Sequence, residues 1–497
     1  MLKKSDLMKL KVKKYKLSAG RPIAIINKET AKTLLASLND RILIKYNSKK
    51  IVAVLDFSSQ MSGKKEIVLS SEILEYLGIH GGESVIVDIA KKPRVIQTIN
   101  KKLRGDKLSK EEILSIIKSI VNNELTETEI AFFISAIYEY GMSMDEIVWM
   151  TEAIFKTGKK LNLNKKIIVD KHSIGGIAGN RTTPLVVSIC AAAGLIFPKT
   201  SSRAITSAAG TADVMEAICR VDFSPIELKK IINKTNACLA WGGSLGFAPA
   251  DDKIIRVESQ INIDPEPNLL ASIMAKKLSV GSKFILIDIP YGKYAKVNKD
   301  KAFDLKKKFE EMGKRFNLKL KCVITNGSEP IGRGVGPVME LIDIVKILKC
   351  EKDAPSDLRN KSLFLSGQIL ELAGKSKKGQ GEKLALGILN SGKAFTKFKE
   401  IVEAQDGKLV ELKPGKFSHE IKSGKTSKVI SIDNKKINIL ARVAGSPNDK
   451  KAGLYIYKHI GEKLNKGDGI ITIYSSSKHK LKDAVDFYKE NKIIQIK

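Results

Sequence analysis

The stretch KKIIVDKHSIGGIAGNRTTPLVVSICAAAG, Lys165–Gly194, decides how the chain is organised. A short apolar, β-branched run that ends at Asp170 is typical of a strand, and a polar, Gly-rich loop, Lys171–Asn180, follows it. Thr182 and Thr183 then precede a proline and an almost wholly apolar segment. A threonine that can cap free amides, an early proline and a terminal glycine predict a helix. We therefore expect a strand–loop–helix unit.

Such a unit can bind an anion, because backbone N–H groups and the positive end of the helix dipole meet at the start of the helix. An ordinary turn between a strand and a helix would explain the same pattern. A second loop of this kind, Ser201–Gly210, precedes another helix start, where Thr211 is the expected cap and Asp213 lies in the first turn. Two such loops close together favour anion binding. Further donors of the first unit are Lys171, Ser173, Thr182 and Thr183.

The composition indicates a globular, multidomain protein. The chain has 497 residues, of which 43% are hydrophobic and 28% charged, and its first residues lack the apolar core of a signal peptide. The five cysteines are widely spaced without a CxxC pair, which favours reduced side chains in a cytoplasmic protein over a disulfide or zinc framework. The five histidines are dispersed, so we expect no metal centre.

The net charge of +33 raises the alternative of a nucleic-acid-binding protein. The lysines, however, are spread along the whole chain, without a basic tail or an aromatic-interleaved RNA motif. This distribution favours a lysine-rich surface that attracts small anionic substrates.

The residue pattern changes several times along the chain, which predicts a multidomain α/β protein. Residues 1–96 are expected to form a β-rich domain, and Leu69–Ile89 resembles one half of a double-psi barrel, which we interpret as a packing or oligomerisation domain. The expected strands of this domain are Pro22–Ile26, Arg41–Tyr46, Ile51–Asp56, Ile67–Leu69 and Ser84–Ile89.

Residues 97–163, together with about 248–282, are expected to form a helical domain. A helix over about Asn268–Leu278 would place Ser272 and Lys276 on one face. Three successive capping boxes support the helical prediction, and Gly141 separates the last two helices. The boxes are Ser109–Glu112, Thr126–Glu129 and Ser143–Glu146.

Residues 164–247 and about 283–415 alternate between strand and helix, which predicts an α/β domain with a mixed sheet containing parallel strands. A third Gly-rich turn, Thr325–Pro337, lies in this domain. Residues 416–497 are expected to form a small α+β domain. Its expected strands are Lys428–Ile432, Ile437–Val443 and Gly469–Tyr474.

The segments DKHSIGGIAGNRTTPLVVSICAAAGL, SSRAITSAAGTADVMEAI and LLASIMAKKLSVGS together resemble the thymidine/pyrimidine-nucleoside phosphorylase family. The resemblance runs from about Gln97 to the C-terminus, and ARVAGSPNDKKAGLYIY is typical of the last domain of that family. The chain is most similar to an archaeal branch with an extra N-terminal domain, the AGNRTTP loop and SSRAITS. Ser207 stands where the nucleoside enzymes carry a histidine, which favours a nucleotide substrate.

The resemblance implies phosphorolysis of AMP to adenine and ribose 1,5-bisphosphate, with CMP and UMP as further candidate substrates. It also implies a helical domain and an α/β domain separated by a cleft, and a homo-oligomer built from dimers. Neither a cofactor nor a metal is implied, since inorganic phosphate is the co-substrate. No membrane partner is expected.

This reaction requires phosphate held by positive charge and donors, an acid that protonates the leaving base, and a second anion site for the 5′-phosphate. By resemblance Asp264 is the proton donor, a role that needs a raised pKa in a shielded cleft, although it could also cap the helix after Pro265. Lys296 could equally be a surface lysine. The sequence leaves open which of the two loops holds which anion.

The resemblance also assigns the binding residues. The nucleotide-binding positions are Gly176, Ser202, Arg203, Ala204, Ile205, Thr206, Ser207, Thr211, Ser272 and Lys296. The phosphate-binding set is Lys171, Ser173, Thr183 and Ser201, to which Thr211 also belongs, and Arg256 and Lys276 resemble residues that contact the base or sugar.

Two other enzyme classes remain as alternatives. A pyrimidine-nucleoside phosphorylase would use thymidine or uridine in place of a nucleotide. A phosphoribosyltransferase of the anthranilate type shares the helical-plus-α/β plan, but it would need Mg²⁺, and the acidic pair that binds this metal is not evident in the sequence.

Overall fold

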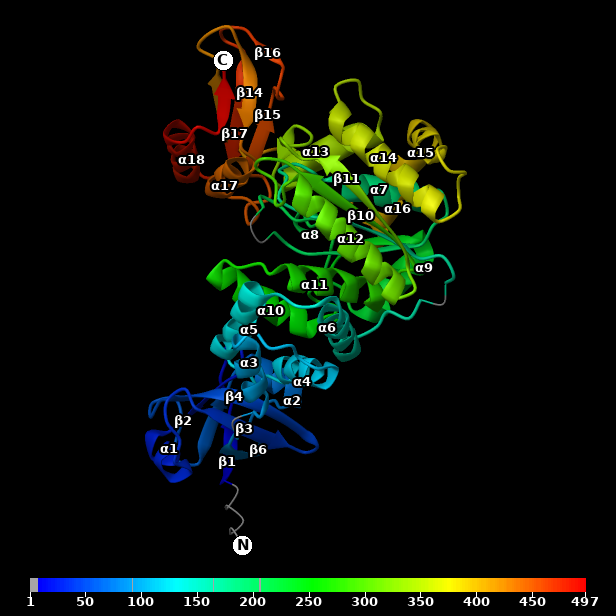
Figure 1. Ribbon diagram of the computed structural model, residues 1–497. Helices are drawn as coiled ribbons and strands as arrows, with labels where there is room; N and C mark the ends of the chain where they lie inside the picture. The colour runs from blue at the N-terminus through cyan, green and yellow to red at the C-terminus, as the bar shows by residue number, and fades with distance from the viewer. Residues whose placement is uncertain (1–7, 92, 164, 205–206) are drawn as a thin grey trace. The chain divides into compact units, whose positions relative to one another are not determined.

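The computed structural model describes residues 8–91, 93–163, 165–204 and 207–497 (Figure 1). The chain divides into two compact units. Unit 1 comprises Met1–Thr157 and Pro249–Ala271, and unit 2 comprises Gly158–Ala248 and Ser272–Lys497. No helix among the described residues is long and apolar enough to cross a membrane.

Unit 1 begins with six strands that close into a barrel in the order β1-β5-β2-β4-β3-β6. All five strands expected from the sequence are present, and β1 is an additional strand. Its sequence MKLKVK alternates between apolar and charged residues, which places Leu10 and Val12 in the barrel core while the lysines remain outside. The elements are β1 (Met8–Lys13), β2 (Ile23–Ile26), α1 (Lys28–Leu34), β3 (Arg41–Tyr46), β4 (Lys49–Phe57), β5 (Glu66–Leu69), α2 (Ser71–Leu77) and β6 (Ser84–Ile89).

Helices make up the rest of unit 1, and the three capping boxes are confirmed. In the first, the Glu112 amide donates to Ser109 Oγ (3.3 Å), and the Ser109 amide donates to the Glu112 carboxylate (2.7 Å). The other two boxes have the same reciprocal bonds. The helices are α3 (Val95–Leu103), α4 (Lys110–Val121), α5 (Glu127–Tyr140), α6 (Met144–Thr157), α10 (Pro249–Ile261) and the first residues of α11 (Glu266–Ser279).

A parallel sheet organises unit 2. Strands β11 (Lys319–Asn326), β10 (Phe284–Tyr291) and β7 (Val169–Ser173) pair in parallel, as do β8 (Phe197–Ser201) and β9 (Ala237–Trp241). A parallel bridge between Ile168 and Ile196 joins the two groups. The carboxyl ends of all five strands therefore meet at one edge, where α/β proteins place their ligands.

The helices of unit 2 enclose α7 (Thr182–Ala192), which is buried along nearly its whole length and contacts α14 and α16. Gly194, at φ +79°, follows the end of this helix as expected, and the Leu195 amide donates back to the Cys190 carbonyl (3.1 Å). The other helices are α8 (Thr211–Met215), α9 (Pro225–Thr235), α12 (Lys299–Arg315), α13 (Pro337–Leu348), α14 (Ser356–Leu372), α15 (Gly381–Asn390) and α16 (Lys393–Ala404).

The C-terminal part of unit 2 contains two small sheets, ordered β12-β15-β17-β13 and β16-β14-β18, and two helices (Figure 1). Strand β12 comes from the third Gly-rich turn and pairs antiparallel with β15, so that this turn joins the C-terminal sheet. The elements are β12 (Gly334–Val335), β13 (Phe417–Lys422), β14 (Ser427–Ile432), α17 (Asn434–Ala444), β15 (Gly453–Ile456), β16 (Lys463–Leu464), β17 (Gly469–Ser475), α18 (Lys478–Glu490) and β18 (Ile494–Ile496).

The strand expected at Ile437–Val443 is wrong, because this segment lies within helix α17. Residues Ile437, Leu440, Ala441 and Ala444 have helical spacing and are all buried. Asp433 caps the helix, because its carboxylate accepts hydrogen bonds from the amides of Lys435 and Lys436. The multidomain α/β fold class is otherwise confirmed.

Substitutions at Ile437 and Ile439 distinguish the helix from the expected strand, in which both side chains would share one face. Ile437 is fully buried, whereas Ile439 is 45% exposed. We expect Ile437→Ala to lower the free energy of unfolding by about 2–5 kcal/mol. Ile439→Ala should change it by less than about 1 kcal/mol. Urea denaturation of both variants measures this, and equal losses would contradict the helix.

Candidate functional site

Buried lysine and aspartate side chains gather along β7, which extends past Asp170, where the sequence predicted its end, to Ser173. The Lys171 ammonium donates to Thr182 Oγ1 (2.7 Å), and the Lys171 carbonyl accepts from the Lys199 ammonium (2.8 Å). Burial lowers the pKa of Lys171 to about 7, although Asp288 opposes this shift. Thr182 is the first residue of α7. Its hydroxyl accepts a hydrogen bond from Lys171, whereas the sequence predicted that a threonine here would cap the helix. Arg181 occupies the cap position.

Asp170, on the same strand, is fully buried between two lysines. Its carboxylate lies 2.7 Å from the Lys277 ammonium and 3.6 Å from the Lys199 ammonium. Burial lowers the pKa of Lys277 to about 7, and Asp170 counteracts this effect. Lys277, on α11, therefore depends on Asp170 for its charge.

A second buried carboxylate, Asp288 on β10, receives hydrogen bonds from Ser173 Oγ (2.7 Å) and Thr325 Oγ1 (2.6 Å) and lies 3.2 Å from the Lys361 ammonium. Burial disfavours ionisation of Asp288, but the lysine and the hydroxyl groups outweigh it and hold its pKa below the usual value. Asp288 thereby fixes the side chain of Ser173, one of the expected phosphate-binding residues.

This cluster contains more cationic than anionic side chains. Three buried lysines and Lys361, whose side chain is 9% exposed, surround two buried aspartates on β7 and β10. An anion at this position would favour the charged form of the lysines, whose burial otherwise disfavours it. The expected phosphate site stays a prediction. The lysines are Lys171, Lys199, Lys277 and Lys361, and the aspartates are Asp170 and Asp288.

The first Gly-rich loop lies against the segment that carries Lys296. Gly176 has φ +101°, and a Cβ atom there would be 3.1 Å from the Lys296 backbone nitrogen. A side chain at position 176 would therefore be strained and crowded. The structure brings these two expected nucleotide-binding residues together, with Lys296 exposed.

A carboxylate of helix α8, Asp213, binds amides of the second loop, which was not expected. Asp213 Oδ2 accepts from the amides of Ala204 (2.7 Å) and Gly210 (2.8 Å). Gly210 is the cap of α8, and Thr211 is its first residue, which corrects the expectation that Thr211 caps this helix. Because a carboxylate already binds two of the loop amides, these amides do not form an open cradle for an anion.

Other side chains of the second loop also have protein partners. The Arg203 guanidinium donates to both Glu216 oxygens (2.5 and 2.6 Å) and lies over the Trp241 ring. The hydrogen bonds from Arg203 and Lys450 outweigh burial and lower the pKa of Glu216 to about 2. Ser207 Oγ donates to the Ala209 carbonyl (3.0 Å). Two expected positions, Ile205 and Thr206, lie outside the described residues.

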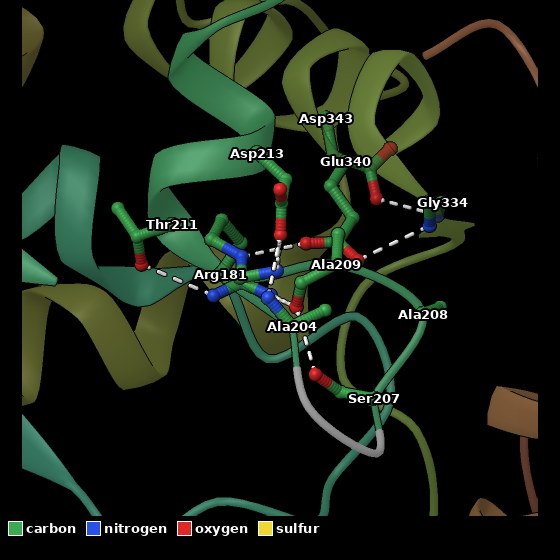
Figure 2. Close-up of polar contacts among 12 residues, drawn as sticks. Arg181, Ala204, Ser207, Ala208, Ala209, Thr211, Asp213, Gly334, Glu340 and Asp343 are labelled. Carbon is green, nitrogen blue, oxygen red and sulfur yellow. Dashed lines mark hydrogen bonds and ion pairs between the residues drawn. The ribbon is translucent and has the colours of Figure 1, made fainter. Parts of the chain in front are cut away.

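Arg181, in the AGNRTTP segment, connects three elements, and the sequence analysis did not single it out (Figure 2). Its guanidinium donates to Glu340 Oε2 (2.6 Å), Thr211 Oγ1 (3.1 Å) and the Ala209 carbonyl (2.6 Å). Glu340 is buried, which raises its pKa, and Arg181 opposes that rise. Arg181 therefore ties the start of α7 to the second loop and to α13. The sequence did contain a signal for Arg181, because the AGNRTTP segment that includes it is a mark of the archaeal branch.

The remaining expected residues are distributed over both units. Asp264 is exposed in the turn between α10 and α11, in unit 1, and Arg256 on α10 donates to the Gly20 carbonyl (2.7 Å). In unit 2, Ser272 and Lys276 are half-buried on α11. Ser201 and Ser202 lie at the start of the second loop, with Ser202 exposed, and Thr183 is buried in the first turn of α7.

The part of the chain that the structure describes contains no group of three or more His, Cys, Asp or Glu side chains arranged to hold a metal ion. The expectation that no cofactor is needed stays a prediction.

Family models match three segments of the chain. Residues 96–158 match the helical bundle domain of a glycosyl transferase family, residues 165–276 match the α/β domain of that family, and residues 428–495 match the pyrimidine nucleoside phosphorylase C-terminal domain. The first two segments correspond to the helical part of unit 1 and to the strands and loops around Lys171.

Curated relatives match nearly the whole chain. An AMP phosphorylase of Methanocaldococcus jannaschii is 44% identical over 93% of both chains, and one of Thermococcus kodakarensis is 42% identical over 98% of both. Among solved structures, anthranilate phosphoribosyltransferase from Thermus thermophilus aligns with a TM-score of 0.52 at 19% identity, covering 62% of this chain and 99% of that one. This last likeness concerns the fold alone.

Arg181→Met should destabilise unit 2, because it leaves the Glu340 carboxylate buried without its partner. We expect a loss of about 3–5 kcal/mol in the free energy of unfolding. Arg181→Lys should recover only part of it, since an ammonium cannot reproduce the planar fork that reaches three acceptors.

Arg220→Lys is the matched control, because Arg220 also forms a fork, with Glu227 and Asp406, but its side chain is 42% exposed. The free energy of unfolding of that variant should fall by less than about 1 kcal/mol. Urea denaturation followed by circular dichroism measures all three variants. A loss at Arg181 no larger than that at Arg220 would refute the connecting role.

Proposed function

The chain belongs to the AMP phosphorylase family, and on this premise we propose that it catalyses the phosphorolysis of AMP to adenine and ribose 1,5-bisphosphate. The observation that carries the proposal is the identity of 42–44% to AMP phosphorylases over nearly the full length of both chains. The buried lysine cluster supports it, because both substrates, AMP and inorganic phosphate, are phosphate anions.

The reaction transfers the ribosyl group from a nitrogen to a phosphate oxygen. The bond between C1′ and the adenine nitrogen breaks, a phosphate oxygen forms the new bond to C1′, and the ribosyl group passes through a cation-like state as in glycoside hydrolysis. Phosphate is already anionic at pH 7, so no base is needed to create the nucleophile. The protein must hold the phosphate in position and shield the developing charges.

Binding of phosphate is proposed for the residues around the first loop. Lys171 and Ser173 are fixed there by Thr182 and Asp288 respectively, which limits the freedom that the side chains would lose on binding. An anion beside Lys171 would also raise its lowered pKa and favour the charged form. The second loop, Ser201–Gly210, with Ser272 and Lys296, is proposed to bind the nucleotide.

Asp264 is proposed as the acid that protonates the departing adenine, because a free purine anion is a poor leaving group. We further propose that the enzyme is cytoplasmic, needs no cofactor beyond phosphate as co-substrate, and assembles from dimers. CMP and UMP are proposed as further substrates.

The central experiment incubates the protein with phosphate and a panel of nucleosides and nucleotides, and identifies the free base and the sugar phosphate by liquid chromatography and mass spectrometry. We expect adenine and a pentose bisphosphate from AMP, only in the presence of phosphate, and much slower release from adenosine. Equal or faster turnover of thymidine or uridine would instead identify a pyrimidine-nucleoside phosphorylase.

Asp264→Asn removes the proposed acid while preserving size. We expect kcat to fall by about 100-fold or more, with little change in AMP binding measured by calorimetry. Asp106→Asn is the control, because Asp106 is also an exposed aspartate of unit 1, paired with Arg104 at 3.6 Å. Wild-type turnover in the Asp264 variant would rule out the acid role.

A further inference from the structure

Two asparagines on helix α17 bind the two substrate loops. Asn434 is fully buried and Asn438 is 5% exposed, and the spacing of four residues places both on one face of the helix. Asn434 Oδ1 accepts from the Ala178 amide (3.2 Å) in the first loop, and Asn438 Oδ1 accepts from the Ala208 amide (3.0 Å) in the second. One helix thus supplies one acceptor to each loop.

The amide nitrogens of the same side chains extend the network. Asn434 Nδ2 donates to the Gly327 carbonyl (3.2 Å), in the third Gly-rich turn, and Asn438 Nδ2 donates to the Asn434 carbonyl (3.0 Å). Both ends of each carboxamide are therefore bonded. Asparagine suits these positions because it both donates and accepts without placing a charge in the interior.

Packing supports the hydrogen bonds. Ala178 and Ala208, each 1% exposed, belong to the same hydrophobic cluster as Ile437, Leu440 and Ala441 of α17. The two loops are thus held through both their amides and their methyl groups. Each held alanine lies close to an expected substrate-binding residue, since Gly176 precedes Ala178 by two positions and Ser207 directly precedes Ala208.

The described residues of the second loop form hydrogen bonds with more than one element. Asp213 and Arg181 bind the backbone of Ala204, Ala209 and Gly210, as described above. Asn438 holds the Ala208 amide between these points from a separate element. Without that acceptor the buried N–H group would be unsatisfied, which favours movement of the loop toward a position where it can be solvated.

We propose that Asn434 and Asn438 are positioning residues for phosphorolysis, which set the distance between the two substrate loops. The proposal rests on the proposed function for its kinetic consequence, but the attachment of the loops can be measured without it. The C-terminal domain then contributes to substrate binding through hydrogen bonds from two of its side chains to the backbones of the loops.

The test begins with Asn438→Leu, which has a similar shape but no acceptor. We expect hydrogen exchange at the Ala208 amide to accelerate at least about tenfold, and KM for AMP or phosphate to rise by about three- to tenfold with kcat within about twofold of wild type. Asn438→Asp restores an acceptor at the same place, so KM should return toward the wild-type value. If the leucine variant does not fold, Asn438→Ala, which adds no bulk, takes its place.

Thr472→Val is the matched control, because it removes a buried hydrogen bond to Tyr457 (3.0 Å) elsewhere in the same domain, on β17. It should leave both KM values and the exchange at Ala208 unchanged. Unchanged exchange at Ala208 in Asn438→Leu, or accelerated exchange with unchanged KM values, would overturn the positioning role. A wild-type protein that releases no adenine from AMP would refute the proposed function, and the exchange data would still decide whether the asparagines hold the loops.

Discussion

The buried lysines of unit 2 depend on one buried carboxylate, Asp170, the second residue of the central strand β7. It offsets the burial of Lys277 and Lys199, and β7 also supplies Lys171 and Ser173. A buried charge without a partner would be strongly unfavourable, so the lysines can occupy the interior only because Asp170 is there. The buried cationic cluster follows from this arrangement.

The described residues of the two loops are held in different ways. The first contains Gly176 at a backbone conformation with positive φ, and it is followed by a helix that is buried on every side. The second has its amides bound by Asp213 and its backbone bound by Arg181. Loops that are fixed before a ligand arrives lose little freedom when it binds, which favours affinity and geometric accuracy.

Much of this arrangement could be predicted from the sequence, because local signals were strong. The capping boxes, the five expected barrel strands and the order strand–loop–helix around Lys171 all depend on short-range patterns. The sequence could not show that Asp213 occupies amides of the second loop, since an acidic residue in a first turn is equally typical of a helix that binds nothing. It also could not reveal the contacts of Asn434 and Asn438.

The contacts of Asn434 and Asn438 could not be predicted from the sequence, for a physical reason. The segment ISIDNKKINILARVA combines β-branched residues with helical spacing, and short apolar runs of this kind do not separate helix from strand. Assigned as a strand, the segment would have placed the two asparagines far apart along its length. The helix brings them within one turn of each other, about 6 Å along its axis against about 13 Å in a strand. There they meet loops more than 200 residues earlier in the chain.

That separation has a consequence for how the protein is made. Ala178 and Ala208 leave the ribosome long before Asn434 and Asn438, which are 256 and 230 residues further on. During synthesis the two loops therefore lack the acceptors Asn434 and Asn438, and the hydrophobic residues of α17, until the last domain emerges. Contacts so distant in sequence form late and slowly. A nascent chain that stops before α17 would contain the lysines of the site, but its two loops would lack their contacts with α17. The site can therefore form completely only after translation has reached the last domain.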